Sequence, residues 1–266
     1  ARDYTLPLSW FGPTTTIGTV HILQWKGPAL ALPPTSYTGF SSVTAVRVTD
    51  GQASEDASVQ LFDPGTTSIS GNVVAPAGAT VFSKALALEF ADHALLPLGQ
   101  DFAIATPFTF AVPRNVTLTA VVSATGEFPN GAGVLRRESG IARGATNVAV
   151  VLPTPALPTA PANGSADVTP ATDFRWNPFA GGLHLVVFNG TAAKPSYFVV
   201  TADSVTHVPD LPALGAALPA ASSYSWFVIG LAPLASVDDY TGIGALVPPI
   251  GSLDESVSDL RTFTTH

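Results

Sequence analysis

Residues that could carry acid–base or metal chemistry are few and scattered along this chain. The five histidines do not recur at spacings such as His-x-His or His-Glu-x-x-His, which place two imidazoles on one metal ion. They are His21, His93, His184, His207 and His266. The chain has no cysteine, which removes thiolate ligands and thiolate nucleophiles. We therefore expect no metal site and no cofactor, and we expect the histidines to be ordinary packed or edge side chains.

Acidic residues gather in two places near the C-terminus, at Asp238-Asp239 and at Asp254-Glu255 with Asp259. Such groups can bind calcium or supply the two opposed carboxylates of a glycosidase. However, the EF-hand pattern and the Gly-x-Ser-x-Gly and Ser-x-x-Lys nucleophile patterns are absent. The simpler interpretation is that these acids lie in solvated loops. We therefore predict no catalytic residue and a protein that is not an enzyme.

Aromatic residues near the N-terminus could instead stack on sugar rings. Trp10, Phe11, Trp25, Tyr37 and Phe40 cluster there. The competing fate is the core, because β-sandwiches bury their large rings. Trp10 lies between Pro7 and Pro13 and is the best candidate for an exposed anchor.

Charge is scarce in the composition. Charged residues make up 11% of the 266 residues, with 11 Lys plus Arg against 19 Asp plus Glu and a formal net charge of −8. Low charge with 46% hydrophobic residues excludes an intrinsically disordered chain. The shortage of cations argues against nucleic-acid binding, which needs clustered Lys and Arg. No apolar run reaches the ~18 residues of a transmembrane helix.

The low charge also bears on assembly and location. Charge normally keeps apolar surface solvated and sheet edges unpaired. Two interpretations are open. The protein is either a neutral monomer or one that buries surface against copies of itself or against another surface protein. The composition, rich in Thr, Ser, Ala and Pro and poor in Lys, predicts a secreted or cell-surface protein. Three glycosylation sequons, at Asn115, Asn163 and Asn189, matter if the producing cell glycosylates.

Short strand-like segments dominate the hydrophobic pattern, punctuated by Pro and Gly. We expect strands at Ile17–Trp25, Val43–Thr49, Ser58–Phe62, Ser68–Val74, Phe108–Val112, Val116–Ser123, Val148–Leu152, His184–Phe188, Tyr197–Thr201, Tyr224–Leu231 and Thr262–Thr265. Only Leu211–Leu218 and Leu253–Leu260 suit one or two turns of helix. This spacing predicts an all-β fold of tandem antiparallel β-sandwiches.

The sharpest boundary is the proline-rich run Pro153–Pro161, which favours an extended spacer. We therefore expect a sandwich over residues 67–153, a linker over 154–162 and a second sandwich over 163–266. Residues 1–66 are a β segment for which two interpretations are open. They form either an incomplete sandwich or a part of the domain that follows.

The first predicted sandwich resembles the carboxypeptidase-regulatory-like, transthyretin-like modules of bacterial surface proteins. The resemblance rests on an opening strand at residues 69–74, a second at 85–90, the Pro-Phe-Thr-Phe-Ala-Val-Pro segment at 107–113, and the strand at 118–122. The family usually has an Asp-Gly turn before the third of these segments, and this chain has Ala105-Thr106 there. The resemblance implies a scaffold without catalysis.

Residues 163–266 resemble a fibronectin type III-like module. Phe174-Arg175-Trp176-Asn177-Pro178 is similar to its early core-tryptophan strand, and Tyr224-Ser225-Trp226-Phe227-Val228 to its late Tyr-x-Trp-x-Val strand. Arg261–Thr265 matches the ending common in bacterial examples. The resemblance places Trp176 and Trp226 between two sheets and lets the Tyr224 hydroxyl fix a corner.

Two functions follow from this sequence. One is a structural or adhesive surface protein that assembles into a fibre, and the other is a polysaccharide-binding accessory module of a larger secreted enzyme. Residues 1–16 bear on the first, because Tyr4, Leu6, Leu8 and Trp10 alternate as in a half-buried strand. Pro7 confines such a strand to a sheet edge or an extended arm. The arm either adds to a sheet of a neighbouring copy or folds back on its own domain.

Overall fold

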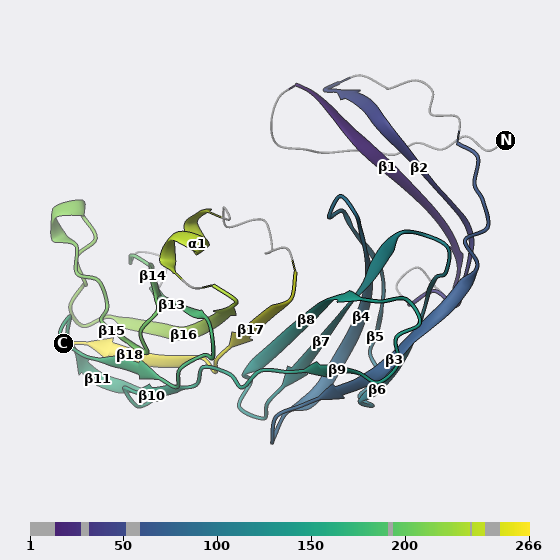
Figure 1. Ribbon diagram of the computed structural model, residues 1–266. Helices are drawn as coiled ribbons and strands as arrows, with labels where there is room; N and C mark the ends of the chain where they lie inside the picture. Colours follow the sequence, from purple (N-terminus) through teal and green to yellow (C-terminus); the bar gives the residue numbers. More distant parts are fainter. Residues whose placement is uncertain (1–13, 28–31, 52–58, 191–193, 235, 243–250) are drawn as a thin grey trace.

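The chain is almost wholly β. The computed structural model describes residues 14–27, 32–51, 59–190, 194–234, 236–242 and 251–266. In this part of the chain, helix is confined to a 3-10 turn, η1 (Pro212–Leu214), and a short helix, α1 (Val237–Gly242). No helix there has the length and hydropathy needed to span a bilayer. The predicted all-β fold is therefore confirmed, and Figure 1 shows two layered units with a long hairpin extending from one of them.

The first sandwich packs a three-stranded sheet against one half of a ten-stranded sheet. The small sheet has the order β6-β3-β9, in which β3 pairs antiparallel with β6 and parallel with β9. Its strands are β3 (Thr66–Val74), β6 (Pro107–Pro113) and β9 (Val148–Val151). The facing strands are β4 (Thr80–Phe90), β5 (Leu95–Asp101), β7 (Leu118–Glu127) and β8 (Gly133–Ile141). Alternating side chains of both layers fill one hydrophobic core, which includes Ile69, Leu86, Leu88, Val112 and Val122.

The second sandwich has its own core, built largely of aromatic rings. The Phe174 ring packs edge-on against three others, those of Phe188, Trp226 and Phe263, at centroid distances of 4.9, 4.8 and 5.1 Å. The small sheet holds β10 (Pro158–Ala160), β12 (Phe174–Trp176) and β15 (Val205–Thr206). The large sheet here holds β11 (Ser165–Val168), β13 (Leu183–Gly190), β14 (Tyr197–Thr201), β16 (Ser223–Ala232), β17 (Leu253–Val257) and β18 (Arg261–Thr265).

One strand, β17, joins the two sandwiches into a continuous sheet. It pairs antiparallel with β16 on one side and with β8 on the other, so that Glu255 has Leu231 and Leu135 as its two register partners. The sequence predicted helical turns over Leu253–Leu260, and this prediction is wrong. Pairing along both edges holds the segment extended, which outweighs its weak local preference.

The proline-rich run differs from the predicted spacer over residues 154–162. Pro158–Ala160 forms β10 and pairs with β12 at the edge of its sheet, where proline is tolerated. Ala156 is fully buried, and its N–H donates to the Ser256 hydroxyl at 3.4 Å. The run therefore crosses between the sandwiches as packed structure.

The N-terminal segment contributes to two places. β1 (Thr15–Lys26) and β2 (Ser36–Thr49) form a separate two-stranded antiparallel sheet, which projects from the first sandwich in Figure 1. Tyr37 and Phe40, at the start of β2, belong to the core of the first sandwich. Residues 1–13, which include most of the predicted arm, lie outside the described residues.

Two described turns contain glycine after Asn or Asp, a pairing that favours tight turns. Asn130-Gly131 closes the β7–β8 hairpin, with Gly131 at a φ of 85° that favours glycine. The Phe128 carbonyl accepts the Gly131 N–H at 2.9 Å in this turn. Asp50-Gly51 is a turn that follows β2.

Candidate functional site

The structure does not gather the five histidines into one cluster. Four pair with one carboxylate each: His21 with Asp92, His93 with Glu89, His207 with Asp173 and His266 with Asp167. His184 is buried, and its Nε2 accepts the Phe179 N–H at 2.9 Å. Burial lowers the pKa of His184, which favours the neutral ring. The described residues contain no group of three or more potential metal ligands.

The acidic groups singled out from the sequence separate into different environments. Asp254 and Glu255 are neighbours on β17, so their side chains point to opposite faces of the sheet. Asp254 accepts from Arg136 at 2.8 Å, whereas Glu255 faces a groove described below. Asp259 pairs with Arg261 at 3.3 Å. Near the start of α1, Asp239 accepts the Ser236 N–H at 2.9 Å, as in a helix cap.

Most of the described aromatic residues that could form a sugar platform are packed inside. Tyr37 and Phe40 are buried in the first core, and Trp25 packs against it half-buried. Trp10 and Phe11 lie outside the described residues. The three described aromatic residues of this group therefore pack in or against the core.

The core predicted for the second sandwich is confirmed in its tryptophans. Trp176 is 3% exposed and Trp226 is 0% exposed. The corner hydrogen bond expected of Tyr224 is not found, because its buried hydroxyl has no hydrogen-bond partner among the described residues. The neighbouring Tyr197 donates its hydroxyl to the Ala216 carbonyl at 3.2 Å. Tyr224 instead stacks on Phe263 at 5.4 Å. Burial raises the pKa of Tyr224 to about 12.

The sequon asparagines differ in what their side chains do. Asn115 is exposed in the loop before β7. Asn163 is exposed as well, but its carboxamide oxygen accepts the Thr262 N–H at 2.8 Å. Asn189 lies in β13, and its sequon threonine is outside the described residues.

The root of the β1–β2 hairpin is fixed on the first sandwich by tight packing. The Tyr37 hydroxyl donates to the Ala111 carbonyl at 2.9 Å, and burial raises the pKa of Tyr37. Phe40 stacks on Phe90 at 6.0 Å. At Gly99 a Cβ would lie 2.4 Å from the carbonyl carbon of Leu32, so only glycine admits this approach of the chain.

A second attachment lies farther along the hairpin, at His21. The imidazole stacks on Phe90 with centroids 3.9 Å apart and planes 3° from parallel. Its Nδ1 is hydrogen-bonded to the Ser42 hydroxyl, and its Nε2 lies 3.0 Å from an Asp92 carboxylate oxygen. The hydrogen bond to His21 is the main cause that lowers the pKa of Asp92. We call this set of four residues the His21 clamp.

Beyond the His21 clamp, the hairpin offers exposed backbone and side chains. Among the described residues neither strand pairs with a third strand; Phe40 alone forms an isolated bridge, to Phe62. Ile17 and Arg47 are register partners near the far end, so their side chains share one face. Ile17 is 61% exposed, and Arg47 is exposed too. Arg47 has no carboxylate partner in the described part of the chain.

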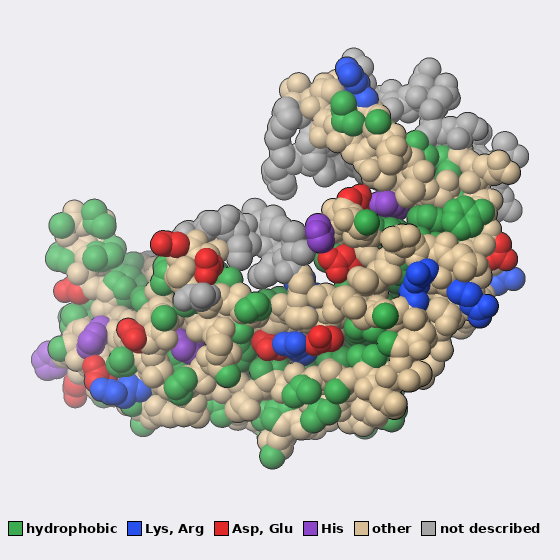
Figure 2. Space-filling model, viewed as in Figure 1, with side chains coloured by type: hydrophobic (Ala, Val, Ile, Leu, Met, Phe, Trp, Pro, Cys, Tyr) green, Lys and Arg blue, Asp and Glu red, His purple; other side chains and the backbone are tan. Residues whose placement is uncertain are grey.

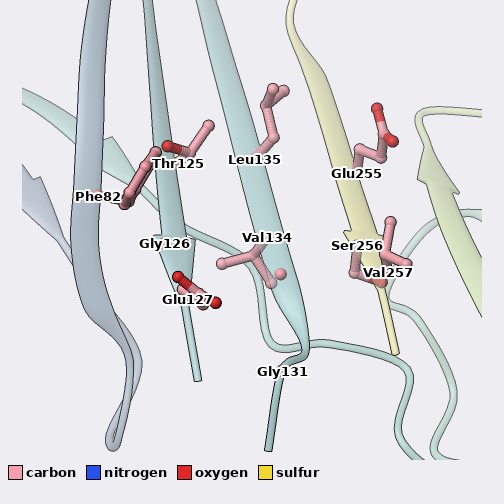
Figure 3. Close-up of a pocket in the computed structure, with 11 residues that line it drawn as sticks. Phe82, Thr125, Gly126, Glu127, Gly131, Val134, Leu135, Glu255, Ser256 and Val257 are labelled. Atoms are coloured by element: carbon pink, nitrogen blue, oxygen red, sulfur yellow. The ribbon is translucent and has the colours of Figure 1, made fainter. Parts of the chain in front are cut away.

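A shallow groove crosses the outer face of the shared sheet at the junction of the sandwiches. Thr125, Leu135 and Glu255 form one row of register partners across β7, β8 and β17. Their side chains point away from the core, and Figure 3 shows those of Leu135 and Glu255 pointing the same way. The groove has a volume of about 270 Å³. Its lining residues are Phe82, Thr125, Gly126, Glu127, Gly131, Gly133, Val134, Leu135, Glu255, Ser256 and Val257.

The groove combines apolar walls with negative charge. Glu127 and Glu255 both line it, and neither has a cationic partner among the described residues. Burial raises the pKa of Glu255, because its carboxylate is partly withdrawn from water. Gly133, which adds no side chain, lies on β8 between the strands that carry the two acids. The groove therefore suits a cation carried on an apolar stem.

Phe82, which lines this groove, belongs to an exposed aromatic pair. Phe82 and Phe102 meet edge-to-face at 6.3 Å and are each more than half exposed. Phe102 lies just after β5, in a segment that the buried Lys84 ties down. The Lys84 ammonium donates to the carbonyls of Ala103 and Ala105 at 2.7 and 2.6 Å.

Sequence reasoning missed the groove because no local pattern marks it. Phe82, Leu135 and Glu255 lie on three strands that only the fold brings together. The strand alternation that sends Leu135 and Val134 to opposite faces is visible in the sequence, but the pairing of β8 with β17 is not.

Comparisons with known proteins assign no family to this chain. No protein-family model and no curated protein matches the sequence. The chain matches part of the crystal structure of the chicken CNTN1 FN1-FN3 domains, with a TM-score of 0.24 and 9% sequence identity. The match covers 71% of this chain and 58% of that one. The strands and cores described above define the protein as a tandem β-sandwich, an architecture common among cell-surface domains.

Proposed function

We propose that the chain is a non-enzymatic, extracellular structural or adhesive surface module that joins to further copies of itself through the β1–β2 hairpin. The observation that carries the proposal is that this hairpin forms a sheet of its own, with edges that pair with no third strand among the described residues. Unpaired strand edges are templates for addition of a strand from another chain.

The surface chemistry supports the same proposal. Figure 2 shows a visible face covered mainly by hydrophobic and uncharged side chains, with few Lys and Arg. Natural sheet proteins place charge on exposed edges to prevent association, and β1 carries no charged residue except its final Lys26. A secreted or cell-surface location fits the composition and stays part of the proposal.

Sedimentation velocity of the full chain, from micromolar to near-millimolar concentration, tests the proposal, with electron micrographs of the same samples. We expect concentration-dependent oligomers or filaments. A single monomeric species throughout contradicts the proposal.

Deletion of residues 1–12 tests the arm, because an arm that adds to a neighbouring sheet is needed for association. Unchanged association with a lower melting temperature shows that the arm is intramolecular.

The alternative, a polysaccharide-binding module, has narrower support. It rests on the exposed Phe82 and Phe102 pair beside the groove. Binding of the full chain to a polysaccharide panel, lost in Phe82→Ala and kept in the exposed-ring control Phe198→Ala, favours this alternative.

A further inference from the structure

We propose that the far end of the β1–β2 hairpin of one copy docks in the groove of the next copy, with Arg47 paired to Glu255 and Glu127 and Ile17 on the apolar wall. This inference rests on the proposed self-association and names the surface that receives the hairpin. Three observations on the two surfaces carry it.

The first observation is charge complementarity. The groove holds two carboxylates with no cation against them in the described residues. Arg137, on the same face of β8, donates its Nε to the Gly251 carbonyl at 2.9 Å. Partial burial of a carboxylate without a partner costs desolvation free energy. A guanidinium from another chain offsets this cost by forming a charge-assisted hydrogen bond.

The second observation is the match in apolar surface. Ile17 lies beside Arg47 on one face of the hairpin, so an apolar and a cationic side chain are presented together. In the groove, Leu135 and Glu255 are likewise register partners, with Phe82 at the end of the row. The two surfaces thus pair apolar with apolar and cation with anion.

The third observation is the relative position of the two surfaces. The hairpin is attached at Phe90, the last residue of β4, whereas the groove includes Phe82 near its start. Eight residues of β-strand separate the two positions by about 27 Å. A contact between different patches of two copies is head-to-tail, and it produces rings or open filaments. The hairpin edges stay available for an added strand in this arrangement.

Charge reversal tests the pairing in the full chain. We expect Arg47→Glu and Glu255→Arg each to weaken self-association roughly tenfold or more in sedimentation velocity at low salt. We expect an equimolar mixture of the two variants to associate again, because each supplies the complement of the other. Arg114→Glu, an exposed cation outside both surfaces, is the matched control and keeps wild-type association.

The outcomes separate this inference from the proposed function. If the wild type associates and Arg47→Glu associates equally well, the hairpin–groove contact is wrong while self-association stands. If the wild type never associates, the proposed function fails and this contact with it. Glu255 is half-buried, so Glu255→Arg could disturb the fold. Glu255→Gln is therefore the second variant, and its melting temperature is compared with that of the wild type. A Glu255→Gln variant that melts as the wild type does must also associate more weakly for the inference to hold.

Discussion

The Arg136 guanidinium in β8 lies 2.8 Å from the Asp254 carboxylate in β17, and this ion pair bridges the two sandwiches. The same guanidinium binds Glu138 at 2.6 Å, so one cation holds two carboxylates. All three side chains are about three-quarters buried. The contact reinforces the one place where β8 and β17 meet.

The bridge predicts a measurable coupling between the sandwiches. Arg136→Ala leaves two partly buried carboxylates without their cation, and we expect it to lower the free energy of unfolding by about 1–3 kcal/mol. Urea denaturation followed by the fluorescence of the four tryptophans, which include Trp176 and Trp226 of the second core, measures this loss. Arg175→Ala is the control, because its pair with Asp173 is exposed and contributes little. Equal losses in the two variants contradict a special role for the junction.

The aromatic core predicts a large effect at Trp226. Trp226→Ala removes a fully buried ring that packs against Phe174, and we expect a loss of about 3–5 kcal/mol. Phe198→Ala, at an exposed ring of the same sandwich, leaves stability almost unchanged. Thermal denaturation of the two variants decides the question, and wild-type stability in Trp226→Ala rules out this core.

The buried lysine predicts a local effect. Lys84→Met leaves the carbonyls of Ala103 and Ala105 without their donor, and we expect a cost of about 1–3 kcal/mol. Limited proteolysis within residues 101–106 should become faster, since the anchored segment loosens. The exposed Lys26→Met serves as the comparison. Equal proteolysis of this segment in both variants means that Lys84 does not anchor it.

The His21 clamp predicts an acid-sensitive hairpin. The pKa of Asp92 is lowered in the folded protein, chiefly by its hydrogen bond to His21. A lowered pKa stabilises the fold above the carboxyl group's ordinary pKa near 4, and this contribution is lost as pH falls through the lowered value. Hydrogen exchange in β1 and β2 should therefore rise below about pH 4, relative to exchange in β7.

Asp92→Asn provides the matched test of the clamp. We expect faster exchange in the hairpin at neutral pH and a smaller further increase in acid. Asp50→Asn, in the turn after β2, keeps the wild-type profile. An acid response in Asp92→Asn as large as in the wild type assigns the pH dependence to another group.

The positions of many strands can be predicted from the sequence, but which strands pair with one another cannot. Runs such as Tyr224–Leu231 carry alternation strong enough to mark β16 without knowledge of the fold. β17 carries Asp254, Glu255 and Ser256, which have weak strand preference, and it is extended because two distant strands pair with it. Lys84 breaks the apolar pattern of β4 because the backbone carbonyls that satisfy it lie on a separate segment. The groove depends on the same long-range pairings, and for that reason local reasoning did not find it.

The shared strand has a mechanical consequence. Tension applied between the β1–β2 hairpin and the C-terminal β18 passes along the covalent connection between β9 and β10 and through the ladders that β17 makes with β8 and β16 (Figure 1). A flexible linker would let each sandwich swing independently and extend under small forces. A sheet that continues across the junction instead transmits load from one sandwich to the other as a stiff element.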